Sequence, residues 1–284
     1  MYYIYLSILI FASGLFTSFQ QQDPIRIMSY NIRYDNPGDG RNSWDHRKDR
    51  LANQIKFYEP DFVGIQEGLV HQVRFLEEQL PHMERIGVGR DDGKEGGEFS
   101  ALFYNTNRFE LVPGTDQTYW LSETPSKPSK SWDAALPRIV TFGKFRNKNS
   151  GQELYVFNTH FDHRGVVARA ESAKLILKTI EKVAGELPVV LTGDFNIVES
   201  SEPYRILTES FLSDAYYTSV LPSAGPSFTF SGFELPLPEN TNRIDFIFVN
   251  EQVQVLKHAI IADFRDGRFP SDHLPVVADV RVEE

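Results

Sequence analysis

The sequence predicts an α+β or α/β sandwich in which two β-sheets pack face to face and helices cover their outer sides. Segments with a strand pattern and segments with helical spacing mingle along the chain, without the strict strand–helix–strand order of a single parallel sheet. Many predicted strands are apolar on both faces, as in sheets that are covered on both sides. No repeat of fixed period or long linker divides the chain, so residues 23–284 are predicted to form one domain.

The N-terminal residues 1–22 are set apart by their composition. Ile4–Phe16 is an apolar run without charge, short for a bilayer span and of the length of a signal-peptide core. Small and polar residues follow, although a basic N-terminal region and a clean small-residue cleavage motif are both missing. We therefore predict a signal peptide and a secreted or periplasmic protein, with an uncleaved N-terminal membrane anchor as the alternative.

The first predicted strand and helix have clear boundaries. Ile25–Ile32 begins with alternating apolar and polar residues, which indicates a strand. Residues 35–44 are rich in Asn, Pro, Gly and Asp, so they are predicted to form a loop. A helix is expected from Arg47, because apolar residues then recur at helical spacing until Pro60 ends the pattern.

The next elements follow the same logic. Phe62–Glu67 is an apolar run that ends in a carboxylate, so a strand is predicted there. Apolar residues at helical spacing over 73–80 predict a second helix, which is closed by a proline. A glycine-rich polar stretch over 87–97 is predicted to form a loop, and Ala101–Tyr104 a short strand.

The middle of the chain contains its least regular part. Prolines exclude long elements from residues 113–137, while Trp120 and Trp132 supply large aromatic faces. A surface loop held by a few buried rings is slightly favoured over a loop that faces the substrate. Strands are predicted to begin at Ile139, directly after Arg138, and at Leu154, which starts a run that ends in His160.

The remaining elements complete the two predicted sheets. Apolar residues at helical spacing over 170–184 predict a third helix. Val189–Asn196 begins as a buried strand and breaks at its glycine, so Asp194 and Asn196, two residues apart, project from the strand end on the same side. Turns and an exposed loop are expected over 211–240. Final strands are expected over 242–249 and 276–282.

The bulk composition limits the chemistry that the protein can use. The formal net charge is -10 at pH 7, so contact with nucleic acid or phospholipid requires a local basic patch or bound metal ions. Cysteine is absent, which excludes disulfides, thiol nucleophiles and cysteine-ligated zinc.

Polar and ionisable residues stand at the predicted strand ends and in the adjoining loops. Such residues would be costly at buried strand ends unless they formed a site together. Carboxylates with an amide suit Mg²⁺ or Mn²⁺, whereas zinc sites more often contain several His or Cys ligands. A turn, cap or salt bridge is the commoner explanation of any one of them, so the prediction depends on the joint pattern. The residues are Asn31, Glu67, His160, Asp194, Asn196, Asp245, Asp272 and His273.

Six short motifs contain these residues, and they are Ser29-Tyr30-Asn31, Ile65-Gln66-Glu67, Asn158-Thr159-His160, Gly193-Asp194-Phe195-Asn196, Arg243-Ile244-Asp245 and Ser271-Asp272-His273-Leu274-Pro275-Val276. In this order they make the chain resemble the endonuclease/exonuclease/phosphatase superfamily of metal-dependent phosphoesterases, which is similar to deoxyribonuclease I. One motif alone is weak, but together they span nearly the whole chain after residue 22. The resemblance implies a deoxyribonuclease I-like α/β/β/α four-layer sandwich with the active site at one edge of the paired sheets.

The resemblance also implies a metal side of the site. It makes Glu67 the principal ligand of Mg²⁺ or Mn²⁺, places Asn31 beside it and adds Asp272 as a further carboxylate. Arg138, directly before a strand, matches an arginine that contacts the substrate phosphate in part of the family.

The same resemblance implies roles in catalysis. Asp194 orients or deprotonates the attacking water, and Asn196 holds the phosphate or that water. Asp245 hydrogen-bonds His273 and fixes its tautomer, while His273 contacts the scissile phosphate or takes part in proton transfer. His160 stabilises the charge that develops on the phosphate oxygens, so that His160 and Asn196 join Arg138 in binding phosphate.

The N-terminal segment and the resemblance together predict a secreted, metal-dependent phosphoesterase in which activated water attacks the phosphorus directly. Its substrate is a phosphate ester, either a phosphodiester or a small phosphoester. A non-catalytic binding module is disfavoured, because the central residues are all present. No obligate protein partner is indicated, and a monomer is expected.

Two alternative substrates remain open. An endonuclease or exonuclease acting on DNA or RNA is the first, although the chain has no strong Lys/Arg run for a duplex. A single strand could be reached through the aromatic residues near Trp120 and Trp132. The second is a sphingomyelinase-like phospholipid phosphodiesterase, with the apolar residues of Gly232–Pro238 as a hairpin that touches the membrane.

Overall fold

Two mixed β-sheets meet face to face in the computed structural model, which describes residues 23–236 and 242–283. The first sheet has the strand order β12-β13-β1-β2-β4-β3. Its strands are β1 (Ile25–Asn31), β2 (Phe62–Gln66), β3 (Met83–Ile86), β4 (Leu102–Asn105), β12 (Val253–Ile260) and β13 (Val276–Val282).

The second sheet has the order β10-β11-β9-β8-β7-β5, and β6 also pairs with β7. Its strands are β5 (Phe109–Leu111), β6 (Gln117–Trp120), β7 (Ile139–Asn147), β8 (Glu153–His160), β9 (Val189–Asp194), β10 (Leu212–Asp214) and β11 (Asp245–Asn250).

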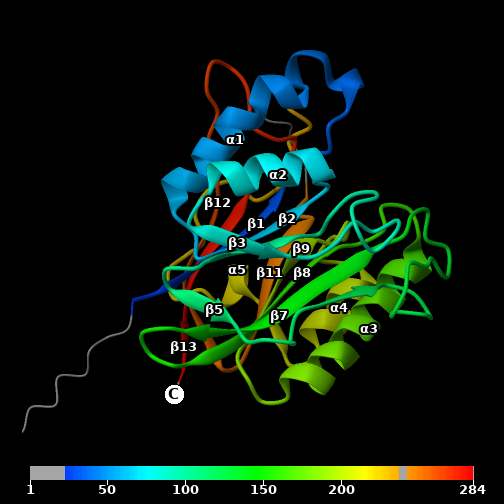
Figure 1. Ribbon diagram of the computed structural model, residues 1–284, viewed down its shortest axis with the longest axis vertical. Coiled ribbons are helices and arrows are strands. Elements are labelled where there is room, and N and C mark those ends of the chain that lie inside the picture. The colour runs from blue at the N-terminus through cyan, green and yellow to red at the C-terminus, as the bar shows by residue number, and fades with distance from the viewer. Residues whose placement is uncertain (1–22, 237–241, 284) are drawn as a thin grey trace, which may run out of the picture.

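Helices cover the outer sides of both sheets (Figure 1). The helices are the 3₁₀ helix η1 (Pro37–Asn42) and α1 (Trp44–Tyr58), α2 (Val70–Gln79), α3 (Val166–Ala184), α4 (Glu202–Thr208) and α5 (Ala215–Thr218). Side chains of α1 and α2 pack on the first sheet, and those of α3 pack on the second. The predicted α/β/β/α four-layer sandwich is therefore confirmed.

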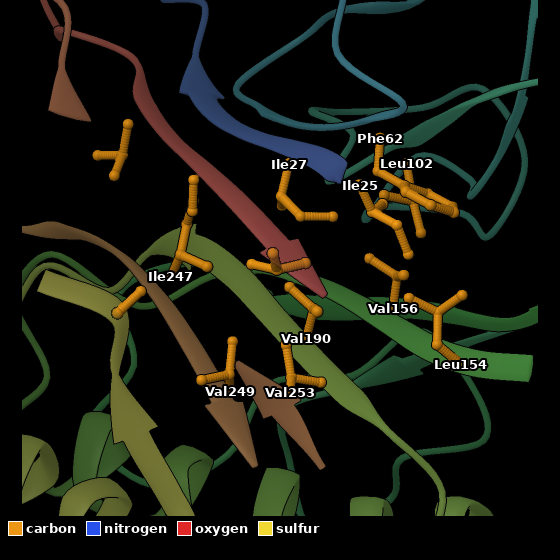
Figure 2. Close-up of a cluster of buried hydrophobic side chains, with 14 of the residues drawn as sticks. Ile25, Ile27, Phe62, Leu102, Leu154, Val156, Val190, Ile247, Val249 and Val253 are labelled. Atoms are coloured by element: carbon orange, nitrogen blue, oxygen red, sulfur yellow. The ribbon is translucent and has the colours of Figure 1, made fainter. Parts of the chain in front are cut away.

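The alternation of side chains along each strand divides the core into three apolar layers. In β8, Leu154 and Val156 point between the two sheets, whereas Tyr155 and Phe157 pack under α3. The layer between the sheets is the central one, and Figure 2 shows its branched and aromatic side chains gathered between the strands. Burying such side chains stabilises the fold by about 1.5–3 kcal/mol each.

The central layer changes from apolar to polar along the strands. In β8, Val156 is followed on the same face by Asn158 and then by His160. The strand register places His160 opposite Asp194 and Asp194 opposite Asp245, so three adjacent strands present ionisable residues side by side. The sequence therefore builds the polar end of this layer from the same alternation that builds its apolar core.

A hydrogen-bonded bridge joins the two sheets just below this polar end. Nδ2 of Asn158 donates to the backbone oxygens of Ile65 and Ala101, at 2.8 and 3.0 Å. Oδ1 of Asn158 accepts from Gln66 Nε2 at 2.7 Å. A Cβ atom on Gly64 would lie 2.5 Å from Asn158 Oδ1, so the sheets approach this closely only because residue 64 is glycine.

Several short elements were not predicted. Helix α1 begins at Trp44 rather than at Arg47, and η1 lies inside the predicted loop over 35–44. Strands β3, β5 and β10 and helices α4 and α5 have three to seven residues each, too few to give a clear periodic pattern. In β12 a register shift between Val255 and Lys257 interrupts the alternation that marks a strand.

The N-terminal prediction lies outside the described residues, because these begin at residue 23. The signal peptide and the alternative anchor therefore both stay predictions. Among the described residues, the helices are all too short or too polar to cross a bilayer.

Candidate active site

A cavity of about 740 Å³ opens at the polar end of the central layer. Seven of the nine predicted site residues line it, and these are Glu67, Arg138, His160, Asp194, Asn196, Asp272 and His273. Asn31 and Asp245 lie behind this lining, where both are buried and hydrogen-bonded to residues of the wall. The structure thus brings all nine predicted residues together.

Asp194 occupies the centre of the cluster. Its Oδ2 atom lies 2.9 Å from Asn31 Nδ2, 3.4 Å from His160 Nε2 and 3.8 Å from His273 Nε2. Its Oδ1 atom accepts from the backbone N–H of Asn196 at 3.0 Å. Burial, followed by the charge of Asp245, raises the pKa of Asp194 to about 7. The carboxyl group can therefore accept and release a proton near neutral pH.

His273 forms a buried dyad with Asp245. The imidazole Nδ1 lies 2.8 Å from Asp245 Oδ2. Burial by itself lowers the pKa of His273, but the charge of Asp245 and this hydrogen bond raise the pKa well above its usual range. His273 is therefore held in its protonated form, with Nε2 directed towards Asp194.

His160 has the opposite environment. Burial and then the positive charge of Arg138 hold the pKa of His160 well below its usual range, so this imidazole is neutral. Its Nε2 lies 3.2 Å from the side-chain amide of Asn196. The cluster thus contains one protonated and one neutral imidazole, so His273 can act as a proton donor whereas His160 can only take part in hydrogen bonds.

The acidic side of the cavity has the donor atoms of a cation site. Glu67 accepts from Asn31 Nδ2 at 3.1 Å and from the backbone N–H of Tyr34 at 3.0 Å. Burial is the main cause that raises the pKa of Asp272, and the charge of Glu67 adds to this rise. One ligand atom each from Glu67, His160 and Asp194 lies within 4.8 Å of the others. The approach of the half-buried Glu67 to the buried Asp194 and Asp272 fits a divalent cation, because a cation would relieve the mutual repulsion of the carboxylates.

Backbone strain is concentrated at the same place. Seven non-glycine residues in the described parts of the chain have a positive φ, and four of them line the cavity. They are Arg33, Glu67, Asn196 and Phe233. Such conformations cost about 1–3 kcal/mol each and persist where the surrounding structure enforces them, which is typical of functional sites.

Comparison with known proteins agrees with this geometry. The sequence profile of the endonuclease/exonuclease/phosphatase family matches residues 28–273. The chain belongs to this family. It is a phosphoesterase with the deoxyribonuclease I-like fold, as the sequence motifs predicted.

Solved structures and a related sequence both match most of this chain. A Bacteroides vulgatus endonuclease/exonuclease/phosphatase is 43% identical, with a TM-score of 0.88 over 92% of this chain and 100% of that one. The mannosyl-6-phosphatase of Bacteroides thetaiotaomicron is 37% identical, with a TM-score of 0.84 over 90% of this chain and 99% of that one. Mouse nocturnin is 23% identical over 92% of this chain and 66% of nocturnin.

Several lining residues were missed by the sequence analysis. Arg33, Glu98, His163 and Phe230 all line the cavity, but they lie on loops rather than at predicted strand ends. Glu98 directly follows the glycine-rich stretch, and Arg90 holds its carboxylate with two bonds of 2.6 and 2.8 Å. No local pattern marks such residues, because contacts distant in sequence place them.

Arg138 lies in the cavity wall among charged neighbours. Its Nη2 is 3.0 Å from His163 Nδ1, while Nε is 3.7 Å from Asp162 Oδ2. Within residues 23–236 and 242–283, Nε and Nη1 have no hydrogen-bond partner, although the side chain is buried. Each of these two inaccessible atoms lies beside a carboxylate, because Nη1 is also 4.0 Å from Glu98 Oε2. Arg138 therefore contributes positive charge to the cavity wall.

One aromatic residue of each alternative binding surface packs into the protein. Trp120 is buried and donates from Nε1 to the backbone oxygen of Arg90 at 2.6 Å, so its ring is not open to stack on a base. Phe233 lines the cavity and packs against the central core, whereas Leu235 of the same predicted hairpin is 39% exposed. Leu237 and Pro238 of the same predicted hairpin lie outside the described residues.

Proposed function

We propose that this phosphoesterase hydrolyses the phosphate monoester of a small sugar with the help of Mg²⁺ or Mn²⁺. The cavity carries the proposal. Its volume of about 740 Å³ is that of a small-molecule site, and acids and imidazoles converge on one part of its wall. Phe230 and Leu136, which are both partly exposed, supply apolar surface at its rim. A substrate of this kind has one strongly charged end and a compact remainder.

Charge and similarity support the same substrate class. The net charge of -10 disfavours an extended polyanion, which depends on many cationic contacts. The mannosyl-6-phosphatase is among the similar structures, at 37% identity over 90% of this chain. A sugar phosphate therefore explains the cavity and the surface charge together.

The acidic residues would hold the cation. Glu67 and Asp272 would bind it, with the Asn31 amide beside them. A bound divalent cation supplies positive charge opposite the phosphate oxygens. Arg138 adds the positive charge of its guanidinium to the cavity wall, and this charge would attract the same phosphate.

The central residues would move the protons. Asp194, with a pKa of about 7, would accept the proton of the attacking water. His273, kept protonated by Asp245, would donate a proton or hydrogen bond to the phosphate. Asn196 and the neutral His160 would donate hydrogen bonds as negative charge grows on the phosphate oxygens.

A substrate panel tests this function. The purified full chain is assayed with mannose 6-phosphate, glucose 6-phosphate, glycerol phosphate, bis(p-nitrophenyl) phosphate, a single-stranded oligonucleotide and sphingomyelin vesicles. We expect kcat/KM for a hexose phosphate to exceed that for the other substrates by about tenfold or more. EDTA should stop turnover, and Mg²⁺ or Mn²⁺ should restore it.

The control for this panel is His273→Ala, which should be inactive on every substrate and so exposes contaminating phosphatases. A preference for the oligonucleotide or for sphingomyelin would refute the sugar phosphate. Turnover that survives EDTA would refute the role of the cation.

A further inference from the structure

The segment Thr229–Gly232 runs beside the loop that carries His273. Phe230 pairs with His273 through an isolated antiparallel bridge. Thr229 and Ser231 are buried, whereas Phe230 is 42% exposed and lines the cavity. The chain thus alternates inward and outward here as a strand does, and it presents one aromatic ring to the cavity.

Thr229 fixes the backbone on the N-terminal side of Phe230. Its Oγ1 accepts from the backbone N–H groups of Ile244 and Asp245, at 3.0 and 3.1 Å. Its carbonyl oxygen accepts from the backbone N–H of Leu274 at 2.6 Å. The residue before Phe230 is therefore bonded both to the start of β11 and to the residue that follows His273.

Ser231 fixes the backbone on the C-terminal side of Phe230. Its Oγ donates to the backbone oxygen of Asp272 at 2.9 Å, and its backbone N–H donates to the same oxygen at 2.7 Å. The backbone on both sides of Phe230 is thus tied to residues of the active site. A residue whose backbone is held in this way loses little further backbone freedom when its ring binds a ligand.

The ring is also placed directly next to the protonated imidazole. The centroids of the Phe230 and His273 rings are 5.1 Å apart, and the two planes meet at 69°. In such a contact the edge of one ring meets the face of the other. Phe230 remains 42% exposed beside His273 and lines the cavity.

We propose that Phe230 is a specificity-determining residue that forms a platform for the ring of the sugar. This inference rests on the proposed function. The phosphate would lie against His160, Asn196 and His273, so the group esterified to it extends past Phe230 towards the rim. A pyranose ring has an apolar face of C–H groups that fits an aromatic surface, whereas an acyclic alcohol has none.

The test compares a cyclic with an acyclic leaving group in matched variants. In Phe230→Ala, we expect kcat/KM for the hexose phosphate to fall about fivefold to tenfold, mainly through KM. The value for glycerol phosphate should change by less than about twofold, because that substrate does not cover the ring. Phe230→Leu keeps apolar bulk beside His273 but removes the aromatic face, so it should show the same selective loss.

Phe264→Ala is the control variant, because Phe264 is an exposed phenylalanine that does not line the cavity. It should leave both substrates unchanged. An equal loss on both substrates in Phe230→Ala would show that the ring acts only by supporting His273. Unchanged kinetics on both would show that it makes no contact with the sugar. Either result overturns the platform.

The experiment distinguishes failure of the Phe230 platform from failure of the proposed function. If the wild type prefers a different cyclic phosphate ester and Phe230→Ala removes that preference, the sugar assignment fails and the platform stands. If the wild type acts only on acyclic esters, both are refuted. If hexose phosphates are the best substrates and Phe230→Ala does not discriminate, the platform alone is refuted.

Discussion

Two buried clusters of ionisable side chains lie on either side of Ile244, and they differ in charge balance. In the first, the guanidinium of Arg243 lies 2.7 Å from both Asp214 Oδ2 and Glu199 Oε1, and 4.1 Å from the ring centroid of Tyr216. The second cluster is the active site around Asp194, where carboxylates outnumber the cations that touch them. We refer to these as the Arg243 cluster and the active-site cluster.

The pKa values show that negative charge is balanced by a cation and hydrogen bonds in the Arg243 cluster but not in the active-site cluster. In the Arg243 cluster, burial opposes ionisation of Glu199, yet hydrogen bonds from Tyr217 and Arg243 hold the pKa of Glu199 below its usual range. In the active-site cluster, burial and the charge of Asp245 raise the pKa of Asp194 to about 7. The first cluster therefore favours its charged form and stabilises the fold. The second keeps an excess of negative charge, which costs stability and is available to bind a cation and move protons.

The largest expected effect comes from Asp194→Asn. Turnover should fall by about a thousandfold or more, because the proton acceptor is lost. The free energy of unfolding at pH 7 without metal should not fall, because the substitution removes a buried charge that is crowded by Asp245. Enzyme kinetics and urea denaturation measure the two quantities.

The matched control is Asp214→Asn, the same substitution in the Arg243 cluster. It should reduce stability, because it leaves Arg243 with one carboxylate fewer in a buried place. If the two Asp→Asn variants lose the same stability, the contrast between the clusters does not exist.

Arg243→Met tests the Arg243 cluster more severely. Removing the guanidinium leaves Asp214 buried without its cation, and the free energy of unfolding should fall by about 3–5 kcal/mol. Methionine retains much of the apolar bulk, so a loss of packing alone would be smaller. A thermal denaturation curve that matches the wild type would show that this ion pair does not stabilise the fold.

The sequence indicates the active-site cluster better than the Arg243 cluster. His160, Asp194 and Asp245 were predicted because each ends or begins a strand, and strand register alone then places them side by side. Arg243 belongs to the same motif as Asp245, but its partners are 29 and 44 residues away in the chain. The packing of loops and short elements brings those partners to Arg243. No periodic pattern in the sequence predicts that packing.

A bound cation should stabilise the active-site cluster selectively. At a Mn²⁺ concentration about 100 times its Kd, linkage predicts about 2.7 kcal/mol of added stability, seen as a higher Tm than in EDTA. Glu67→Gln should abolish most of this shift, because it removes a carboxylate from the cation site. Asp214→Asn should retain the full shift, since Asp214 is not a cation ligand. Equal Tm values with Mn²⁺ and EDTA in the wild type would argue against a cation at this site.

The smallest expected effect is a pH dependence at His258, which borders the Arg243 cluster. His258 is buried, its ring centroid lies 5.4 Å from that of Tyr216, and Nδ1 is 2.7 Å from Ser223 Oγ. Burial lowers the pKa of His258 to about 4, while the charges of Asp214 and Arg243 oppose each other. The unfolded chain binds this proton below about pH 6.5 and the folded chain does not, so stability is lost as the pH falls from about 6.5 to 4.

At pH 5.5 this loss amounts to about 1.4 kcal/mol. Asp194 acts in the opposite direction, because its raised pKa makes the folded chain bind a proton more readily than the unfolded chain between about pH 7 and 4. The two effects overlap in the wild type, so the measurement is the difference in unfolding free energy between wild type and His258→Gln from pH 7.5 to 5. That difference should shrink or reverse by about 2 kcal/mol between pH 7.5 and 5, because the variant lacks the penalty. Parallel pH curves would mean that His258 does not stay neutral in the fold, and that the Arg243 cluster accepts a further positive charge without cost.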